Sequence, residues 1–174
     1  MLLLAVVAIF VLAFGAVVFI GAPYVPTLKK DIDKAFDDLY PVDSGDVVVD
    51  IGSGDGKVLR AAASRGARTL GYEINPFLAG ISMLLSIGKP RISTRLDNIW
   101  VVQFPADTTL VYVFTTTRDA KRISQKIQNE VERIGTDLHV MSYGATLPGG
   151  THQRTAGAHH LYLYKALHNK KPQV

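Results

Sequence analysis

A glycine-rich segment after a run of β-branched residues is the part of the sequence best suited to bind a small charged ligand. Residues 47–51 read VVVDI and residues 52–56 read GSGDG. A strand that ends in an acid and leads into glycines, which let the main chain approach a ligand, is typical of nucleotide-type cofactor sites. The order G-x-G-x-G places the third glycine one position earlier than in dinucleotide loops, which read G-x-G-x-x-G. The segment therefore predicts a cofactor site and disfavours a dinucleotide-dependent oxidoreductase.

Two acids at predicted strand ends have chemistry that suits such a ligand. Asp50 closes the first strand, where it either pairs with a positively charged amino group or only caps the turn. Glu73 stands roughly twenty residues further on, the distance at which an acid accepts from ribose hydroxyl groups in related sites. A solvent-exposed Glu is the alternative for Glu73, although Gly71 before it and Asn75-Pro76 after it fix its position in the chain.

Later strand ends supply further candidates. Asp97 and Asn98 follow the third predicted strand, and either could accept from an adenine amino group, with a solvated loop as the alternative. The segment Thr115-Thr116-Thr117-Arg118 follows the fourth strand, where a second substrate is expected to approach. Threonine is not a base at neutral pH and arginine stays protonated, so no general base is predicted there. The five histidines show no metal-ligand spacing, and no metal site is predicted.

The elements that must position these residues follow from the hydrophobic periodicity and the helix signals. Asn75 and Pro76, for example, form an N-cap and a first-turn proline. Predicted helices cover residues 28–40, 57–65, 75–88 and 119–134, and predicted strands cover 47–51, 69–73, 92–96, 109–115, 138–142 and 160–165. Residues 144–158, rich in Gly and Thr, are predicted as a loop. This alternation predicts an α/β, Rossmann-like fold: a mainly parallel twisted sheet with helices on both faces.

The first 22 of the 174 residues contain no charged side chain. At 1.5 Å per residue this length crosses a hydrocarbon core of about 30 Å, which predicts one N-terminal transmembrane helix. No basic residue precedes the apolar run and residues 19–22 fit a signal-peptide cleavage site poorly, so an uncleaved anchor is expected. Lys29 and Lys30 come just after it, and the positive-inside rule predicts a single-pass membrane protein whose remaining domain is cytoplasmic.

The composition indicates which partners and which chemistry to expect. The net charge is +4, without the dense basic stripe and interleaved aromatics of a nucleic-acid interface, so attraction to anionic lipid is expected instead. The chain has no Cys, which excludes disulfides and thiol catalysis. We expect four segments: the anchor at 1–22, a proline segment and helix at 23–45, the ligand-binding domain at 46–167, and a basic tail at 168–174.

The chain resembles the class I (seven-β-strand) methyltransferases that use S-adenosylmethionine (SAM). Within them it is similar to the small membrane-anchored protein-lysine methyltransferases that modify the adenine nucleotide translocase and the c-ring protein of ATP synthase. The motifs that carry the resemblance are Pro23-Tyr24-Val25-Pro26-Thr27, Asp50-Ile51-Gly52-Ser53-Gly54-Asp55-Gly56, Gly71-Tyr72-Glu73-Ile74-Asn75-Pro76, Asn98-Ile99-Trp100 and Leu161-Tyr162-Leu163-Tyr164. The glycine motif alone marks only the superfamily, whereas the other blocks in this order are more specific.

The resemblance implies SAM as the cofactor and, as methyl acceptor, a lysine on a membrane or membrane-associated protein. The residues expected to bind SAM are Asp50, Gly52, Ser53, Gly54, Gly56, Glu73, Ile74, Asp97 and Asn98. The acceptor slot is expected near Thr27, Thr115, Thr116 and Thr117. Eukaryotic members carry an acid where this chain has Asn98, so the adenine contact stays open between Asp97 and Asn98. A membrane-associated small-molecule or lipid methyltransferase, or a non-catalytic SAM-binding module, are the alternatives.

Overall fold

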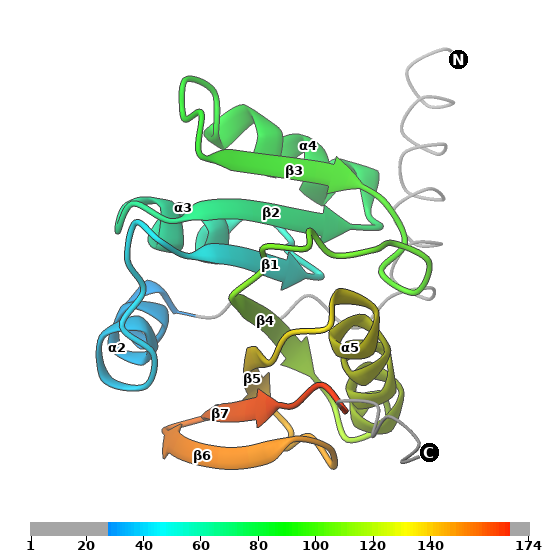
Figure 1. Ribbon diagram of the computed structural model, residues 1–174. Coiled ribbons are helices and arrows are strands. Elements are labelled where there is room, and N and C mark those ends of the chain that lie inside the picture. Colours follow the sequence, from blue (N-terminus) through cyan, green and yellow to red (C-terminus); the bar gives the residue numbers. More distant parts are fainter. Residues whose placement is uncertain (1–27, 168–174) are drawn as a thin grey trace, which may run out of the picture.

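A computed structural model describes residues 28–167 of the chain, in which helices and strands alternate before the chain ends in a run of strands (Figure 1). The order is α2 (Lys29–Asp38), β1 (Val47–Ile51), α3 (Lys57–Ala63), β2 (Arg68–Glu73), α4 (Pro76–Leu85), β3 (Ile92–Leu96), β4 (Leu110–Thr115), α5 (Ala120–Ile134), β5 (Leu138–Gly144), β6 (Thr151–Ala156) and β7 (His159–Tyr164).

All seven strands form one sheet, in the order β3-β2-β1-β4-β5-β7-β6. The first five run parallel, and β7 pairs antiparallel with both β5 and β6. The chain first builds outward from β1 to β3 and then returns to place β4 on the other side of β1. Because strand order reverses between β1 and β4, the carboxyl ends of these strands border the crevice where ligands bind in α/β sheets. The predicted α/β fold with a mainly parallel sheet is confirmed.

Helices cover both faces of the sheet, and each face has its own hydrophobic core. On one face, Ile123, Ile127 and Val131 of α5 pack against alternate residues of the central strands. On the other face, Ile32 and Phe36 of α2 pack with α3 and the intervening strand residues. In Figure 1, α5 lies in front of the sheet, with α3 and α4 behind it. The strand β1 is buried along its whole length, as expected for a parallel strand covered on both faces.

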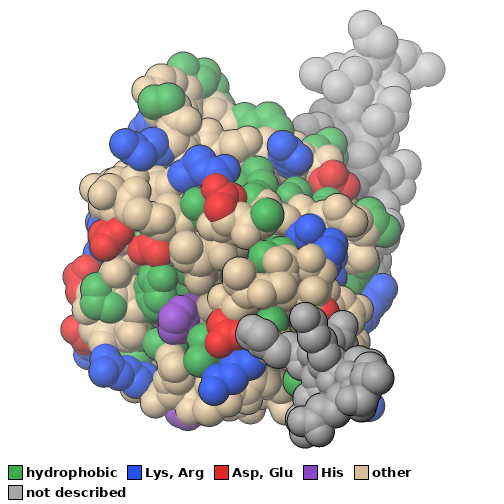
Figure 2. Space-filling model, viewed as in Figure 1, with side chains coloured by type: hydrophobic (Ala, Val, Ile, Leu, Met, Phe, Trp, Pro, Cys, Tyr) green, Lys and Arg blue, Asp and Glu red, His purple; other side chains and the backbone are tan. Residues whose placement is uncertain are grey.

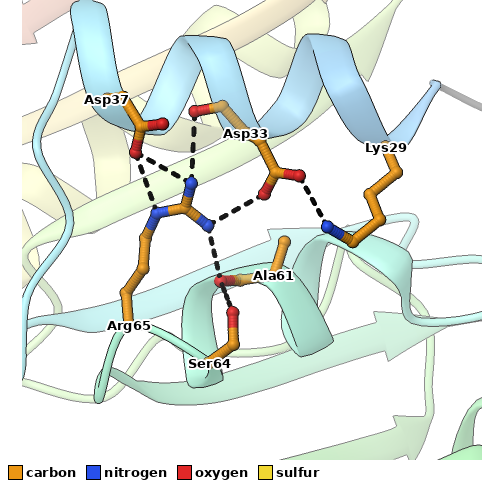
Figure 3. Close-up of polar contacts among 6 residues, drawn as sticks. All are labelled: Lys29, Asp33, Asp37, Ala61, Ser64 and Arg65. Atoms are coloured by element: carbon orange, nitrogen blue, oxygen red, sulfur yellow. Dashed lines mark hydrogen bonds and ion pairs between the residues drawn. The ribbon is translucent and has the colours of Figure 1, made fainter.

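Arg65, just after α3, forms ion pairs and hydrogen bonds with α2. Arg65 binds Asp33 at 3.0 Å and Asp37 at 2.8 Å, and its guanidinium also donates to the carbonyl oxygens of Asp33 and Ala61 (Figure 3). These ion pairs are partly exposed, so each contributes little, but the planar guanidinium holds several acceptors at once. This contact links α2, the first described helix, to the end of α3.

The structure corrects one element and leaves others untested. The predicted loop at 144–158 contains β6, which reads THQRTA and is almost fully exposed. Such a polar strand has no hydrophobic alternation, and its extended form comes from pairing with β7 at the edge of the sheet. The predicted anchor at 1–22, Thr27 and the tail at 168–174 lie outside the described residues. Within residues 28–167, none of the helices is long and apolar enough to cross a membrane.

Candidate functional site

The glycine loop between β1 and α3 contains three glycines with positive φ angles. Gly52, Gly54 and Gly56 have φ angles of 84°, 54° and 80°, a region that residues with a side chain rarely adopt. The amides of Gly52 and Ser53 both donate to the carbonyl oxygen of Tyr72, at 2.9 and 3.1 Å, which ties the loop to β2. A Cβ built on Gly52 would meet no atom of the described residues within 4 Å. The main chain at Gly52 is therefore approachable from outside.

The carboxylate of Glu73, at the end of β2, is hydrogen-bonded to this loop. One carboxylate oxygen accepts from the Gly54 amide at 2.8 Å, and the other accepts from the Asn75 amide at 2.8 Å. The side chain is 7% exposed. A carboxylate oxygen has two lone-pair directions, so each oxygen retains capacity for one further donor. The structure thus brings Glu73 and the glycine loop together, and it fixes the carboxylate in a single orientation.

Asp50 is a buried acid without a partner among residues 28–167. It lies in β1 between Gly71 of β2 and Tyr112 of β4, and it is 3% exposed. Burial raises the pKa of the Asp50 carboxyl well above its usual range, and the nearby charges of Glu73 and Asp55 raise it further. A cation placed beside this carboxyl would favour its ionised form. The site is therefore suited to a positively charged group.

The side chains of Asp97 and Asn98 make different contacts in the turn after β3. The Asp97 amide donates to the Glu73 carbonyl oxygen at 2.9 Å, which places the turn beside the glycine loop. The Asn98 side-chain oxygen already accepts from the Trp100 amide at 3.1 Å. Asp97 uses one oxygen to accept from the Asn98 amide, and its side chain is exposed. Its second oxygen has no donor within the described part of the chain. Ile74, also exposed, lies between Glu73 and the start of α4.

The three threonines after β4 lie at the same sheet edge but play different roles. Thr115 is 2% exposed, and its carbonyl oxygen accepts from the Ala145 amide. Thr116 binds the Asp119 carboxylate at 3.0 Å and shapes the start of α5, whereas Thr117 is exposed. The Arg118 guanidinium lowers the pKa of Asp119, so this acid stays ionised. Among the described residues 115–119, none is therefore suited to accept a proton from a substrate near neutral pH.

An aromatic group beside the threonines was missed by the sequence analysis. Phe114 and Tyr143 are neighbours in register at the ends of β4 and β5, with ring centroids 6.2 Å apart, and both are partly exposed. His159 lies 4.7 Å from the Tyr143 ring and contacts the Tyr112 hydroxyl at 2.9 Å. Burial lowers the pKa of His159 to about 4, so it is neutral at pH 7. Strand parity could have found this group, because Tyr112 and Phe114 share one face of β4.

The lack of a side chain at Gly71 allows the glycine loop and α3 to pack closely against β2. A Cβ at Gly71 would lie 2.5 Å from the Ser53 hydroxyl oxygen and 2.6 Å from a Leu59 methyl carbon. We expect Gly71→Ala to lower the free energy of unfolding by about 1–3 kcal/mol, measured by urea denaturation. Gly80→Ala is the matched control, since a Cβ there meets nothing within 4 Å in the described part of the chain and a helical alanine is favoured over glycine. Equal stability of the two variants would contradict the prediction.

Comparison with known proteins agrees with this geometry. No family model matches the chain. The RNA methyltransferase of Salinibacter ruber, solved with S-adenosylhomocysteine, superposes with a TM-score of 0.67 over 86% of this chain and 98% of that one, at 24% identity. The chain has the class I methyltransferase fold. Geranyl diphosphate methyltransferase, solved with SAM, shares this fold with a TM-score of 0.54 over 67% of this chain and 49% of that one, at 18% identity.

The relatives found by sequence comparison are lysine N-methyltransferases. The Xenopus laevis lysine N-methyltransferase named for the C-subunit of ATP synthase is 31% identical over 113 residues, which cover 63% of this chain and 49% of that protein. The human protein of the same name is 28% identical over 138 residues, which cover 78% of this chain and 57% of that protein. This chain thus spans about half the length of these relatives.

Proposed function

We propose that this chain is a SAM-dependent protein-lysine methyltransferase. The observation that carries the proposal is the glycine loop, held by Glu73 next to a buried acid, Asp50, that has no partner within residues 28–167. The residues present fit SAM: an open main chain at Gly52, an acid suited to its amino group, and a carboxylate with free acceptor capacity suited to its ribose. SAM would supply a methyl group already activated on a sulfonium.

In this proposal each residue of the site has one role. Asp50 pairs with the α-amino group, and Glu73 accepts from the two ribose hydroxyls. Gly52 and Gly54 let the main chain come close, and Ser53, Gly56 and Ile74 complete the walls of the site. These contacts orient the methyl group toward the edge formed by β4 and β5, and alignment of this kind supplies most of the catalysis.

We assign the adenine contact to Asp97 because one of its carboxylate oxygens has no donor among the described residues, whereas the single side-chain oxygen of Asn98 already accepts from the Trp100 amide. We expect Asp97→Ala to weaken SAM binding by about 5- to 10-fold, since one hydrogen bond to a charged but exposed acceptor is lost. Asn98→Ala is the matched neighbour and should change the dissociation constant by less than about twofold. Calorimetric titration of both variants decides between them, and a larger loss for Asn98→Ala would reverse the assignment.

The proposed acceptor is the side-chain amine of a lysine, by analogy with the curated relatives, which are named as lysine N-methyltransferases. The partly exposed rings of Phe114 and Tyr143 at the strand ends suit the approach of a lysine ammonium group, because a cation is attracted to aromatic faces. Lysine must lose its proton before it attacks, and an apolar slot favours the neutral amine. A slot near Thr27, Thr115, Thr116 and Thr117 that removes water would therefore not need a general base.

We further propose that residues 1–22 anchor the domain to a membrane, with the domain on the cytoplasmic side and a membrane-associated protein as substrate. The support is the uncharged length of this segment and the two lysines, Lys29 and Lys30, that follow it.

Transfer of radiolabelled methyl groups from SAM to native membranes tests the function. Label in a protein band that survives acid hydrolysis as methyl-lysine is the expected result. Label found only in the lipid extract would instead favour a lipid or small-molecule methyltransferase. Binding of SAM without transfer to any fraction would favour a SAM-binding module that acts through a partner. A Glu73→Ala preparation serves as the negative control in each case.

A further inference from the structure

Helix α4 packs on the sheet with its small and polar side. Ala79 is 1% exposed and Ser82 is fully buried, and the Ser82 hydroxyl contacts the Thr94 hydroxyl of β3 at 2.7 Å. The Ser86 hydroxyl, just beyond the helix, is also buried and has no partner among the described residues. A surface helix of a soluble domain normally turns its large apolar residues inward. In α4 the inward side is the less apolar one.

The large apolar residues of α4 and of the following turn point away from the protein. Met83, Leu84 and Leu85 are 45%, 66% and 46% exposed, and Ile87 is 74% exposed. The sequence of the helix, PFLAGISMLL, contains no charged residue. Isolated exposed apolar residues are ordinary, but a contiguous apolar surface on one element marks an interaction site. We call the residues 83, 84, 85 and 87 the α4 surface.

Basic residues border the α4 surface. Lys89 and Arg91 are exposed in the turn that leads to β3, and the Lys89 ammonium donates to the Leu85 carbonyl oxygen at 2.8 Å. Figure 2 shows hydrophobic side chains at the end of the molecule that carries the connection between α4 and β3, with Lys and Arg side chains next to them. Apolar residues rimmed by basic ones are the pattern of a helix that lies in the interface of an anionic membrane.

We propose that the α4 surface docks onto the headgroup region of an anionic bilayer, with Lys89 and Arg91 on the lipid phosphates. The proposal rests on the proposed anchor at residues 1–22. Only residues 23–27 separate that segment from Leu28, where the described domain begins. Fully extended, this connection spans at most about 20 Å. A domain of this size is roughly 35–40 Å across, judged from its expected radius of gyration. A tether shorter than the domain keeps one of its faces against the bilayer.

The docking would also set the position of the active site. Helix α4 begins directly after Glu73 and Asn75, and it packs against β2 and β3. With α4 in the interface, these strands lie along the membrane, and the sheet edge that carries Glu73 opens beside the headgroups. The acceptor lysine of the proposed reaction would then be one that lies close to the membrane surface.

The full chain has no Cys, so single labels report the docking without further changes. Leu84→Cys places a fluorophore on the α4 surface, and Lys121→Cys, an exposed position on α5 across the sheet, is the matched control. The protein is reconstituted in vesicles of phosphatidylcholine and phosphatidylserine. We expect nitroxides on the lipid chains to remove most of the fluorescence at 84 and little at 121, and aqueous iodide to do the reverse.

Two results would overturn the proposal. If iodide quenches both labels equally in vesicle-bound protein, the α4 surface faces water. If neither quencher reaches the label at 84, the surface is covered by protein, either residues 1–22 or a second copy, and dilution of the protein in the vesicles separates these two. Flotation with the vesicles is measured first. A chain that does not float fails at the anchor, whereas a floating chain with an iodide-accessible label fails at the docking alone. Neither result alters the methyl-transfer assay.

Discussion

Replacing Glu73 by alanine should weaken SAM binding by roughly 100-fold. Hydrogen bonds to a charged group contribute about 1.5–3 kcal/mol each, and about 1.4 kcal/mol corresponds to a factor of ten in affinity. The variant loses the proposed acceptors of both ribose hydroxyls. It also leaves the amides of Gly54 and Asn75 without the carboxylate that holds them, at 2.8 Å each, so the loop is no longer fixed for the ligand. Calorimetric titration with SAM measures the loss.

Glu73→Gln separates the two parts of this effect. The amide keeps one oxygen acceptor but turns an NH₂ group toward a backbone donor, so an intermediate affinity is expected. The free energy of unfolding must be measured alongside, because a buried donor that loses its acceptor costs about 1–3 kcal/mol. An alanine variant that is folded and binds SAM with unchanged affinity would remove Glu73 from the cofactor site.

Replacing Asp50 by asparagine should have opposite effects on stability and binding. The variant keeps the shape of a buried side chain without a charge that costs free energy to bury. We therefore expect a higher melting temperature without ligand at neutral pH, with each kcal/mol equivalent to about 2–4 °C in a chain of this size. SAM affinity should fall by roughly 10- to 100-fold, because the proposed partner of its amino group is lost. An active site that costs stability in this way is common in enzymes.

The pH dependence of stability follows from the raised pKa of Asp50. In the unfolded chain an Asp carboxyl ionises near pH 4, whereas in the folded protein burial and the charges of Glu73 and Asp55 keep the pKa of Asp50 well above that. Between these two pKa values the folded state binds more protons than the unfolded state, so the free energy of unfolding falls as the pH rises. Asp50→Asn removes this contribution. Wild-type and variant melting temperatures that stay parallel from pH 4 to neutral pH would contradict the assignment.

Much of the fold could be predicted because local signals and packing agree in the parallel half of the sheet. Residues 47–51 and 92–96 were predicted with the bounds that β1 and β3 have in the structure. The Asn75 cap is also confirmed, since its side chain accepts from the amides of Phe77 and Leu78. The strand β6 was not predictable from its own residues, since its extended form depends on β7 and its exposed side chains carry no pattern.

In the candidate site, too, some features could be predicted from the sequence and others could not. The proximity of Glu73 to the glycine loop could be predicted because spacing along the chain already implies it. The absence of a partner for Asp50 within the described residues, and the use of the Asn98 oxygen by Trp100, depend on three-dimensional contacts that spacing does not encode. The outward-facing side of α4 was missed for a similar reason. Its sequence is apolar almost throughout, so periodicity could not tell which side meets the sheet.

The cofactor site is tested most directly by titrating SAM into the purified full chain and following the heat of binding. The expected result is one SAM bound per chain, with S-adenosylhomocysteine competing for the same site and NADH producing no signal, since the glycine spacing does not fit a dinucleotide. The Glu73→Ala protein, shown to be folded by its melting curve, should lose most of the heat. A folded wild-type chain that binds neither SAM nor S-adenosylhomocysteine would contradict the proposed function.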